Sequence, residues 1–335
     1  MLTKERAEEH TVAIRAQLGR FFDLSSDDKA LMLNNADWLC SLNLLDFLRD
    51  IGKHFSVNEM IKRDSVRTRL EERDQGISYT EFSYMLMQAY DFLYLFQHHD
   101  CTIQMGGSDQ WGNIVSGKEL IRRVAGKRGE GITFPLLMAS SGKKFGKSEE
   151  GSVWLDAKRT SPYQMYQYWL QTADADAIRY LKLFTFLDQS RIQELEEEVA
   201  SRPEKREAQR VLAAESTAIV HGADTVQAVE AASRILFHAS DEIPTAKTVA
   251  MLAREMPVTE VTAAIGLVDL LVQTRLAESK GAARKLIEGG GVYLNHERQT
   301  QAQKTVSVDD LKWPGAMLLR AGKKNYHLVV IRTAP

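Results

Sequence analysis

The sequence predicts an α/β protein, and two observations carry that prediction. Between residues 83 and 137, a helical pattern, a short apolar strand, a second helix and a second strand follow one another, which is an α/β order. After about residue 148 the chain is helical without a convincing strand, and strand patterns return only near its end. We therefore expect an α/β part, a helical part and a small mixed part.

Composition narrows the functional classes. The 335 residues include 26% charged and 44% hydrophobic residues, and the formal net charge is −2. This balance argues against bulk electrostatic attraction to nucleic acid but leaves room for a local basic patch. The two cysteines, Cys40 and Cys101, lie far apart without a metal-binding spacing, so we expect a reducing cytoplasm and no structural metal. No apolar run approaches the ~18 residues of a membrane span.

Two segments in the first hundred residues have helical patterns, and the second of them carries a candidate site. Residues 3–20 are expected to form an amphipathic helix with Val12, Ile14 and Leu18 turned inward. Residues 83–96 form a largely apolar helical pattern that nevertheless contains three polar side chains at i, i+4 and i+7, on one helix face: Tyr84, Gln88 and Asp91.

A polar face on an apolar helix needs partners. A buried carboxylate is costly without a hydrogen-bond donor, so Asp91 is expected to meet either a donor within the protein or a ligand. A phenol hydroxyl would suit Asp91, and an ammonium group would suit Tyr84 and Gln88. The spacing alone leaves both readings open.

A glycine-rich turn follows the first strand. The apolar run 101–105 leads into Gly106 and Gly107, and Asp109 and Gln110 come directly after them. Ligands of open α/β sheets bind beyond the carboxyl ends of strands. Glycine lets the backbone approach a ribose or a base, Asp109 could accept ribose hydroxyls, and Gln110 could bind a carboxylate or carbonyl. A helix over 114–125 and a strand over 132–137 follow.

Two lysines three positions apart stand on the next loop, in the segment Lys144-Phe145-Gly146-Lys147-Ser148. Such a cationic clamp suits a polyphosphate. A P-loop is disfavoured. The first glycine of that motif stands five positions before the second, whereas Gly142 precedes Gly146 by only four.

The second half is predicted as a helical region followed by a small mixed module. Ser161 and Pro162 indicate a helix start, and the helical pattern continues to about residue 240. Residues 241–262 contain Pro244 and Pro257 and resemble a connector with room for one short helix. Short helices over 268–273 and 281–288, a strand over 292–295 and a hairpin over 317–331 are expected after it. Basic side chains here, including Arg284 and Lys285 on one helix, predict a phosphate-backbone patch.

Three motifs together resemble one family. SYMLMQAYDF, QMGGSDQWGNI and KFGKS, in this order and spacing, closely resemble bacterial tyrosyl-tRNA synthetases, which are class I aminoacyl-tRNA synthetases. The resemblance extends over nearly all of the chain. It implies the C-terminal portion of a Rossmann-like nucleotide-binding catalytic domain (1–148), an α-helical anticodon-side domain (149–240), a linker (241–264) and an α-L type RNA-binding domain (265–335).

The resemblance also implies roles for individual residues. Tyr84 and Gln88 would hold the amino group of the substrate tyrosine, Asp91 its phenol, and Gln104 and Gln110 the side of the pocket nearer its carboxyl group. Gly107 and Asp109 would contact the adenylate ribose. The two catalytic lysines, which would stabilise the charge that develops on pyrophosphate, are Lys144 and Lys147.

Partners follow from the same resemblance. They are tyrosine, ATP with Mg²⁺, and tRNA(Tyr), whose acceptor end would meet Arg122 and Arg123 and whose body would meet Arg284 and Lys285. Family members are homodimers, with the stretch 47–82 near the two-fold axis. A membrane is not among the expected partners.

One departure from the family is expected to matter. Class I synthetases carry a HIGH-type motif, and this chain has none. Its first helix resembles one that follows roughly the first ninety residues of family members, which would supply the first strands of the sheet. On this reading the chain by itself would not support tyrosine-dependent pyrophosphate exchange. The alternative is a non-catalytic RNA-binding protein that is derived from the synthetase.

Overall fold

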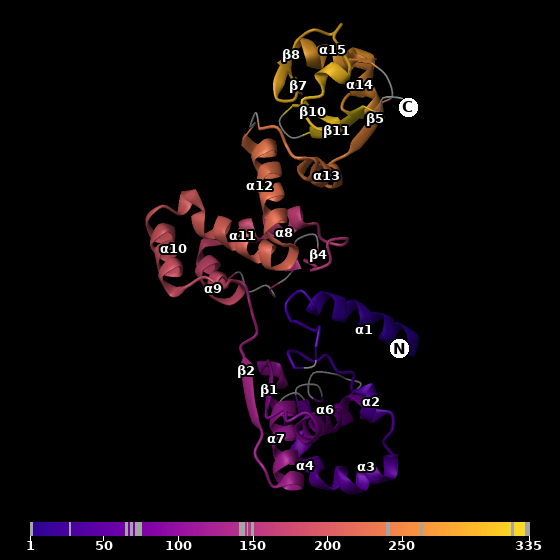
Figure 1. Ribbon diagram of the computed structural model, residues 1–335, viewed down its shortest axis with the longest axis vertical. Helices are drawn as coiled ribbons and strands as arrows, with labels where there is room; N and C mark the ends of the chain where they lie inside the picture. The colour runs from indigo at the N-terminus through magenta and orange to yellow at the C-terminus, as the bar shows by residue number, and fades with distance from the viewer. Residues whose placement is uncertain are drawn as a thin grey trace. The chain divides into compact units, whose positions relative to one another are not determined.

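The computed structural model describes residues 3–26, 28–63, 66–67, 70, 76–140, 145, 147–148, 151–238, 242–261, 264–322 and 325–331. The chain divides into two compact units, Leu24–Phe145 and a second unit that combines Met1–Asp23 with Gly146–Pro335 (Figure 1). Within the described ranges, no helix has the length and apolar character needed to cross a membrane.

The unit Leu24–Phe145 is an α/β unit. Its elements are, in order, α2 (Ala36–Leu39), α3 (Leu44–Asp50), the 3₁₀ turn η1 (Gly52–His54), α4 (Val57–Ile61), α6 (Tyr79–His98), β1 (Ile103–Gly107), η2 (Ser108–Gln110), α7 (Trp111–Ala125) and β2 (Glu130–Phe134). The helix–strand–helix–strand order predicted for residues 83–137 is confirmed, with bounds shifted by a few residues.

The packing of α6 against α7 forms the centre of this unit. α6 begins with a capping box in which Ser78 and Glu81 exchange hydrogen bonds. Its buried side chains, among them Phe92, which is 1% exposed, pack against Leu120 and other residues of α7. The two helices come close at Gly117, where a Cβ atom would lie 2.9 Å from the Phe92 ring. A side chain at this position would therefore push the helices apart.

β1 and β2 pair in parallel, with Met105 opposite Ile132. One face of this two-stranded sheet meets α7, because a Cβ atom on Gly131 would lie 2.4 Å from Ile114. The other face exposes apolar side chains: Ile103, Met105, Ile132 and Phe134 are each between 43% and 62% exposed. Gln104 therefore points toward the α7 side, since side chains alternate along a strand.

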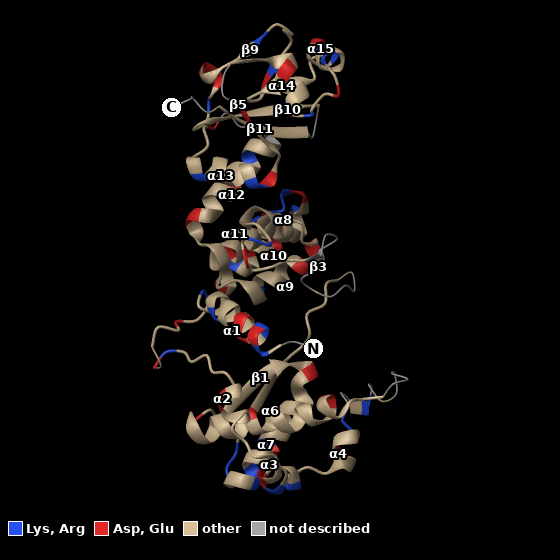
Figure 2. Cartoon of the chain, turned by 90° about the vertical axis from the view of Figure 1, so that its right-hand side faces the viewer, with Lys and Arg blue, Asp and Glu red and all other residues tan. Residues whose placement is uncertain are grey.

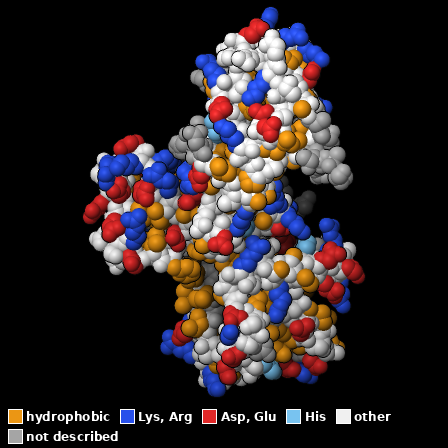
Figure 3. Space-filling model, turned by 45° about the horizontal axis from the view of Figure 1, so that its top comes forward, with side chains coloured by type: hydrophobic (Ala, Val, Ile, Leu, Met, Phe, Trp, Pro, Cys, Tyr) orange, Lys and Arg blue, Asp and Glu red, His pale blue; other side chains and the backbone are white. Residues whose placement is uncertain are grey.

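The helical part of the second unit begins with α1. Its elements are α1 (Lys4–Leu18), the hairpin strands β3 (Lys147–Ser148) and β4 (Gly151–Ser152), α8 (Pro162–Leu170), α9 (Asp174–Phe184), α10 (Gln189–Ser201), η3 (Pro203–Lys205), α11 (Glu207–His221) and α12 (Ala223–His238). The predicted start of α8 is confirmed, because the Ser161 side chain accepts a hydrogen bond from the Gln164 backbone. Figure 3 shows both signs of charge interspersed over the surface around α10.

α1 differs from the expectation in two ways. Val12 and Ile14 were expected inward, but they are 71% and 50% exposed, so that prediction is wrong. The helix was also assigned to the α/β part, whereas it belongs to the second unit. Arg20, just after α1, connects this segment to the second unit. Its guanidinium donates hydrogen bonds to the backbone oxygens of Leu155 (3.1 Å) and Val220 (3.5 Å). Both contacts are distant in sequence, and no local pattern announces them.

The C-terminal module contains a five-stranded sheet in the order β5-β11-β10-β7-β8. The elements are α13 (Ala246–Glu255), β5 (Val258–Val261), β6 (Ile265–Gly266), α14 (Leu267–Gln273), α15 (Lys280–Glu288), β7 (Val292–Leu294), β8 (Glu297–Gln299), β9 (Thr305–Val306), η4 (Val308–Asp310), β10 (Ala316–Ala321) and β11 (Asn325–Ile331). α14 and α15 pack on the sheet, and Leu271, Ile287 and Leu319 lie in the shared core.

The segment 241–264 was predicted as a linker with room for one short helix, and the strand within it was not predicted. It contains α13, which Thr245 caps, and β5, which pairs in parallel with β11. The prolines that suggested a connector flank these elements and do not interrupt them. Pro257 even takes part in the pairing, because its backbone oxygen accepts a hydrogen bond from the Leu328 backbone at 3.0 Å.

We expect Gly117→Ala to lower the free energy of unfolding by roughly 1–3 kcal/mol, because the new methyl group overpacks the α6–α7 contact at Phe92. Urea denaturation measures the change. Gly281→Ala on α15 is the matched control, since its nearest neighbour would be 3.9 Å away and alanine is the better helix former. Equal effects of the two substitutions would contradict the packing argument.

Candidate functional site

Two neutral donors hold the Asp91 carboxylate. Trp38 Nε1 donates to one oxygen at 2.8 Å, and Asn35 Nδ2 donates to the other at 3.0 Å. Trp38 is only 7% exposed, and its ring stacks on Tyr94 with 4.5 Å between centroids. Asp91 therefore has donors within the protein, one of the two alternatives that the sequence left open. These donors fix its orientation, and neither brings a positive charge.

Asn113 joins the polar face of α6 to the glycine-rich turn. Its Nδ2 donates to Gln88 Oε1 at 2.9 Å and to Gln110 Oε1 at 3.2 Å. Gln110 Nε2 in turn donates to Asp109 Oδ2 at 3.0 Å. The structure thus brings Gln88, Gln110 and Asp109 into one hydrogen-bonded network, although they come from α6 and η2. Tyr84, one turn before Gln88 on α6, is 56% exposed.

The turn itself depends on glycine. A Cβ atom on Gly107 would lie 2.5 Å from Asp109 Oδ1, so any other residue would displace that carboxylate. Gln104 precedes the turn on β1, and its Oε1 atom is buried without a donor among the described residues.

The lysine pair falls largely outside the described residues. Lys144 is one of the residues that the structure does not describe. Lys147 lies in β3, where its backbone pairs with Ser152 of β4. This hairpin belongs to the second compact unit, whereas Asp91 and Gln110 belong to the first.

Arg122 and Arg123, near the end of α7, share one carboxylate. Arg122 donates to Glu119 at 2.6 Å and 2.9 Å, and Arg123 Nε donates to it at 2.6 Å. Arg123 also donates to the His54 backbone oxygen, which ties α7 to η1. Hydrogen bonds from Arg122 and then Arg123 lower the pKa of Glu119 to about 2. Arg122 remains the more accessible of the two, with its side chain 65% exposed against 34%.

The basic residues of α15 lie on the surface of the C-terminal module. Arg284 and Lys285 are exposed, and no ion pair joins either of them to another described residue. Lys280, at the start of the same helix, does pair with Asp269 at 2.7 Å. Figure 2 colours the lysine and arginine positions of α15 blue.

Three residues of the network were not identified from the sequence: Asn35, Trp38 and Asn113. Asn113 follows Gln110 by three positions on a helix, so its position beside Gln110 was available from spacing. Asn35 and Trp38 lie more than fifty residues before Asp91, and no sequence pattern links them to it.

No group of three or more His, Cys, Asp or Glu side chains is close enough to hold a metal ion within the described ranges. Asp109 is the carboxylate nearest to the glycine turn, and it is bonded to Gln110. The polar groups that the structure describes at this site are amides, carboxylates, the Trp38 indole N–H and the Tyr84 hydroxyl.

Two family models match the chain. The model described as tRNA synthetases class I (W and Y) matches residues 1–238. The model described as the tyrosine–tRNA ligase SYY-like C-terminal domain matches residues 248–329. The second match includes most of α13 and all of β5, in agreement with their place in the C-terminal module.

Curated relatives and solved structures agree with these models. The chain is 46% identical to the tyrosine–tRNA ligase of Roseiflexus castenholzii, over 98% of this chain and 79% of that protein. It is 49% identical to the one from Anaeromyxobacter dehalogenans, over 99% and 80%. The crystal structure of a C-terminally truncated mitochondrial tyrosyl-tRNA synthetase from Aspergillus nidulans matches with a TM-score of 0.54 and 36% identity, over 61% of this chain and 57% of that one.

The pKa of Glu119 predicts a pH-dependent contribution to stability. Because the folded-state pKa is lowered from 4.5 to about 2, the ion pairs stabilise the fold fully above about pH 4.5. The contribution is lost as the pH falls from 4.5 toward 2. The difference in unfolding free energy between wild type and Glu119→Gln should therefore shrink over this range.

Urea denaturation at a series of pH values measures this difference. Glu8→Gln, which changes an exposed carboxylate on α1, is the matched control and should show no such trend. A difference for Glu119→Gln that stays constant down to the acid limit would contradict the assignment.

Proposed function

The chain belongs to the class I tyrosyl-tRNA synthetase family, and from this premise we propose how its residues act as a tyrosine–tRNA ligase. The match of residues 1–238 to the synthetase family model favours the ligase over the non-catalytic alternative, so we expect this chain to support tyrosine-dependent pyrophosphate exchange. The enzyme activates tyrosine with ATP to form tyrosyl-adenylate and pyrophosphate, and then transfers tyrosine to tRNA(Tyr) with release of AMP. The observation that carries the proposal is the Asp91 carboxylate, which Trp38 and Asn35 orient and which forms no ion pair with any residue that the structure describes.

Asp91 accepts the hydrogen bond of the substrate phenol. A carboxylate held by two neutral donors keeps its charge and retains free lone pairs for a further donor. Phenylalanine lacks the hydroxyl group. Its ring would remove water from the Asp91 carboxylate without donating a hydrogen bond in place of the water. Sites built to bind a substrate hydroxyl reject the analogue without it, and this class of enzyme is the known example of that effect.

The amino and carboxyl ends of tyrosine meet the amide network. Tyr84 and Gln88 hold the ammonium group, because the Tyr84 hydroxyl is accessible and Gln88 Oε1 can accept a second donor beside Asn113. Gln110 contacts the carboxyl group, and Gln104 lines the same side of the pocket.

ATP binds at the glycine turn. Gly107 lets its backbone approach the ribose, and Asp109 accepts the ribose hydroxyls. Lys144 and Lys147 stabilise the charge that develops on pyrophosphate as the tyrosine carboxylate attacks the α-phosphorus. Mg²⁺ on the phosphates neutralises part of the same charge. The reaction is an in-line displacement, so positioning and electrostatic stabilisation carry it without a protein nucleophile.

The tRNA contacts involve both compact units. We assign Arg122 and Arg123 to the acceptor end, and Arg284 and Lys285 on α15 to the body of tRNA(Tyr). Arg284 and Lys285 have no ion pair among the described residues, so their charge is available to phosphate, whereas contact with Arg122 and Arg123 exchanges their ion pairs with Glu119 for pairs with phosphate. The two free cysteines suit a protein that works in the cytoplasm.

A homodimer is the proposed assembly. On α3, Leu44, Leu45 and Leu48 are 69%, 75% and 42% exposed, and on α4, Val57 and Ile61 are 56% and 42% exposed. These five exposed apolar side chains all lie at or near the stretch that family resemblance places near the two-fold axis. Burial of such side chains against a second copy of the chain would remove them from water.

Trp38→Phe tests the tyrosine pocket. The variant keeps an aromatic ring against Tyr94 but removes the donor to Asp91, so the KM for tyrosine should rise roughly tenfold, as for loss of a hydrogen bond to a charged group. The KM for ATP should not change, and discrimination against phenylalanine should fall. Tyrosine-dependent ATP–pyrophosphate exchange measures all three quantities.

Trp154→Phe is the control for this experiment, because Trp154 lies in the other compact unit, where Arg159 covers its ring. Equal KM values for tyrosine in wild type and Trp38→Phe would contradict the proposal that Asp91 binds the substrate phenol. Binding of tRNA(Tyr) without any tyrosyl-adenylate formation by the wild type would contradict the ligase function itself.

Leu45→Asp should convert the dimer to monomers, because it places a charge in the apolar surface on α3. We expect the dimer dissociation constant to rise at least roughly tenfold. Sedimentation equilibrium measures it. Leu31→Asp changes a leucine that is 45% exposed outside α3 and should leave the dimer intact. A monomeric wild type, or equal behaviour of the two variants, would refute this interface.

A further inference from the structure

Asn113 connects the two glutamines that we assign to opposite ends of the substrate tyrosine. Its Nδ2 lies 2.9 Å from Gln88 Oε1 and 3.2 Å from Gln110 Oε1. Gln88 lies on α6, whereas Asn113 lies in the first turn of α7 and Gln110 directly before that helix. All three side chains are half-buried, so the hydrogen bonds are shielded in part from competing water. The direction of each bond determines which group each glutamine presents to a ligand.

The Asp109 carboxylate fixes these directions. Gln110 Nε2 lies 3.0 Å from Asp109 Oδ2, and an ionised carboxylate can only accept a hydrogen bond. Gln110 must therefore turn its amide nitrogen toward Asp109 and its oxygen toward Asn113. Asn113 in turn must offer its nitrogen to Gln110, and the same nitrogen donates to Gln88. One negative charge at the glycine turn thus sets the orientation of three amides.

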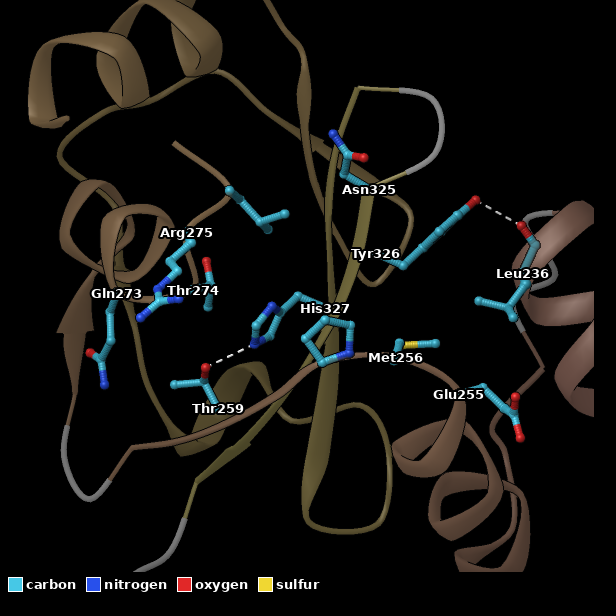
Figure 4. Close-up of a pocket in the computed structure, with 12 residues that line it drawn as sticks. Leu236, Glu255, Met256, Thr259, Gln273, Thr274, Arg275, Asn325, Tyr326 and His327 are labelled. Atoms are coloured by element: carbon cyan, nitrogen blue, oxygen red, sulfur yellow. Dashed lines mark hydrogen bonds between the residues drawn. The ribbon is translucent and has the colours of Figure 1, made fainter. Parts of the chain in front are cut away.

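A hydrogen bond between neutral groups lacks this constraint, as a pair in the C-terminal module shows. There Thr259 Oγ1 and His327 Nε2 are 2.8 Å apart (Figure 4). Burial lowers the pKa of His327, so its imidazole is neutral at neutral pH. A hydroxyl group and a neutral imidazole nitrogen can each donate or accept, so either direction is available to this pair. The Asn113 network differs because its last acceptor is charged.

The fixed directions match the two charged ends of an amino acid. Gln110 Nε2 has a second N–H bond beside the one that it directs to Asp109, and this donor suits a carboxylate. Gln88 Oε1 has a second lone pair beside the one that Asn113 uses, and this acceptor suits an ammonium group. The reverse arrangement would exchange the nitrogen and oxygen of Gln110, and an amide oxygen repels a carboxylate.

We propose that Asn113 is a positioning residue of the tyrosine site. It holds the oxygen of Gln110 and passes the polarity that Asp109 imposes on to Gln88, without itself contacting the substrate. This role rests on the proposed ligase function and extends it to a residue outside the assigned pocket. The direction of hydrogen bonding at Asn113, and not only the presence of a side chain there, then determines the affinity for tyrosine.

Asn113→Ala and Asn113→Asp test this role. Alanine removes the donor, so the dissociation constant for tyrosine should rise roughly tenfold, as for the loss of two hydrogen bonds. Aspartate has nearly the size of asparagine but can only accept, so it would face the oxygens of Gln88 and Gln110 and reverse both amides. We expect the aspartate variant to bind tyrosine at least roughly tenfold more weakly than the alanine variant. Isothermal titration calorimetry without ATP measures these constants.

A second substitution at Asp109 gives a readout that a loss of packing would not produce. Asp109→Asn supplies an N–H group beside Gln110, which can then turn its oxygen toward position 109 and its nitrogen toward position 113. The double variant Asp109→Asn/Asn113→Asp should therefore bind tyrosine roughly threefold or more tightly than Asn113→Asp alone. Asp109→Ala removes the charge without supplying a donor, so it should restore less affinity to Asn113→Asp.

Ser116→Ala is the matched control, because it removes a hydrogen bond from the same helix three positions later. Ser116 Oγ donates to the backbone oxygen of Gly112 within α7, and neither residue belongs to the amide network. A bond of this kind to the preceding turn contributes little to a helix, so the affinity for tyrosine should stay within about twofold of wild type. Urea denaturation checks that each variant is folded before its affinity is compared.

Three outcomes would overturn the role of Asn113 and leave the ligase function intact. These are wild-type affinity in Asn113→Ala, tighter binding of tyrosine by Asn113→Asp than by Asn113→Ala, and equal restoration by Asp109→Asn and Asp109→Ala. Absence of tyrosine-dependent pyrophosphate exchange in the wild type, together with tyrosine affinities in the expected order, would instead contradict the ligase function and support the positioning role.

Discussion

The two hydrogen bonds that Trp38 and Asn35 donate to Asp91 are the constraint on which the tyrosine pocket depends. An arginine in their place would hold the carboxylate equally well, but it would neutralise the charge and occupy the lone pairs. Neutral donors fix the direction of the carboxylate and leave its capacity to accept another hydrogen bond. Specificity for a hydroxylated ring therefore arises from the choice of partner for Asp91, and the stacking of Trp38 on Tyr94 holds that partner in place.

The same pocket requires a close approach of two helices. α6 supplies Gln88 and Asp91, and α7 supplies Asn113, so the amide bridge exists only while these helices keep their spacing. Gly117 permits that spacing because it has no side chain to meet Phe92. Packing and recognition are thus coupled: the small residue in the core determines whether the polar groups outside the core can reach one another. At the end of β1, Gly107 likewise has no side chain, and this leaves room for the Asp109 carboxylate.

The sequence predicted what depends on local pattern and missed what depends on distant contacts. α6, α7 and the strand before Gly107 were expected because helical periodicity, strand propensity and glycine turns are local properties. The role of Asn35 and Trp38 was not predicted, since their link to Asp91 spans more than fifty residues. α1 was assigned to the wrong unit for the same reason, because Arg20 is held by the backbone of Leu155 and Val220. α13 and β5 were taken for a linker because their flanking prolines are ordinarily read as breakers.

Counting basic residues overestimates how much of this surface can contact RNA. The net charge of −2 gives no bulk attraction, so binding depends on individual cations that are free to meet phosphate. Arg123 is largely committed to Glu119 and to the His54 backbone, and the arginines around α10 lie among carboxylates that pair with them. A phosphate that displaced such a carboxylate would gain only the difference between two similar ion pairs. The cations that can add net affinity are therefore those without a partner in the described structure, and Arg284 and Lys285 on the C-terminal module are of this kind.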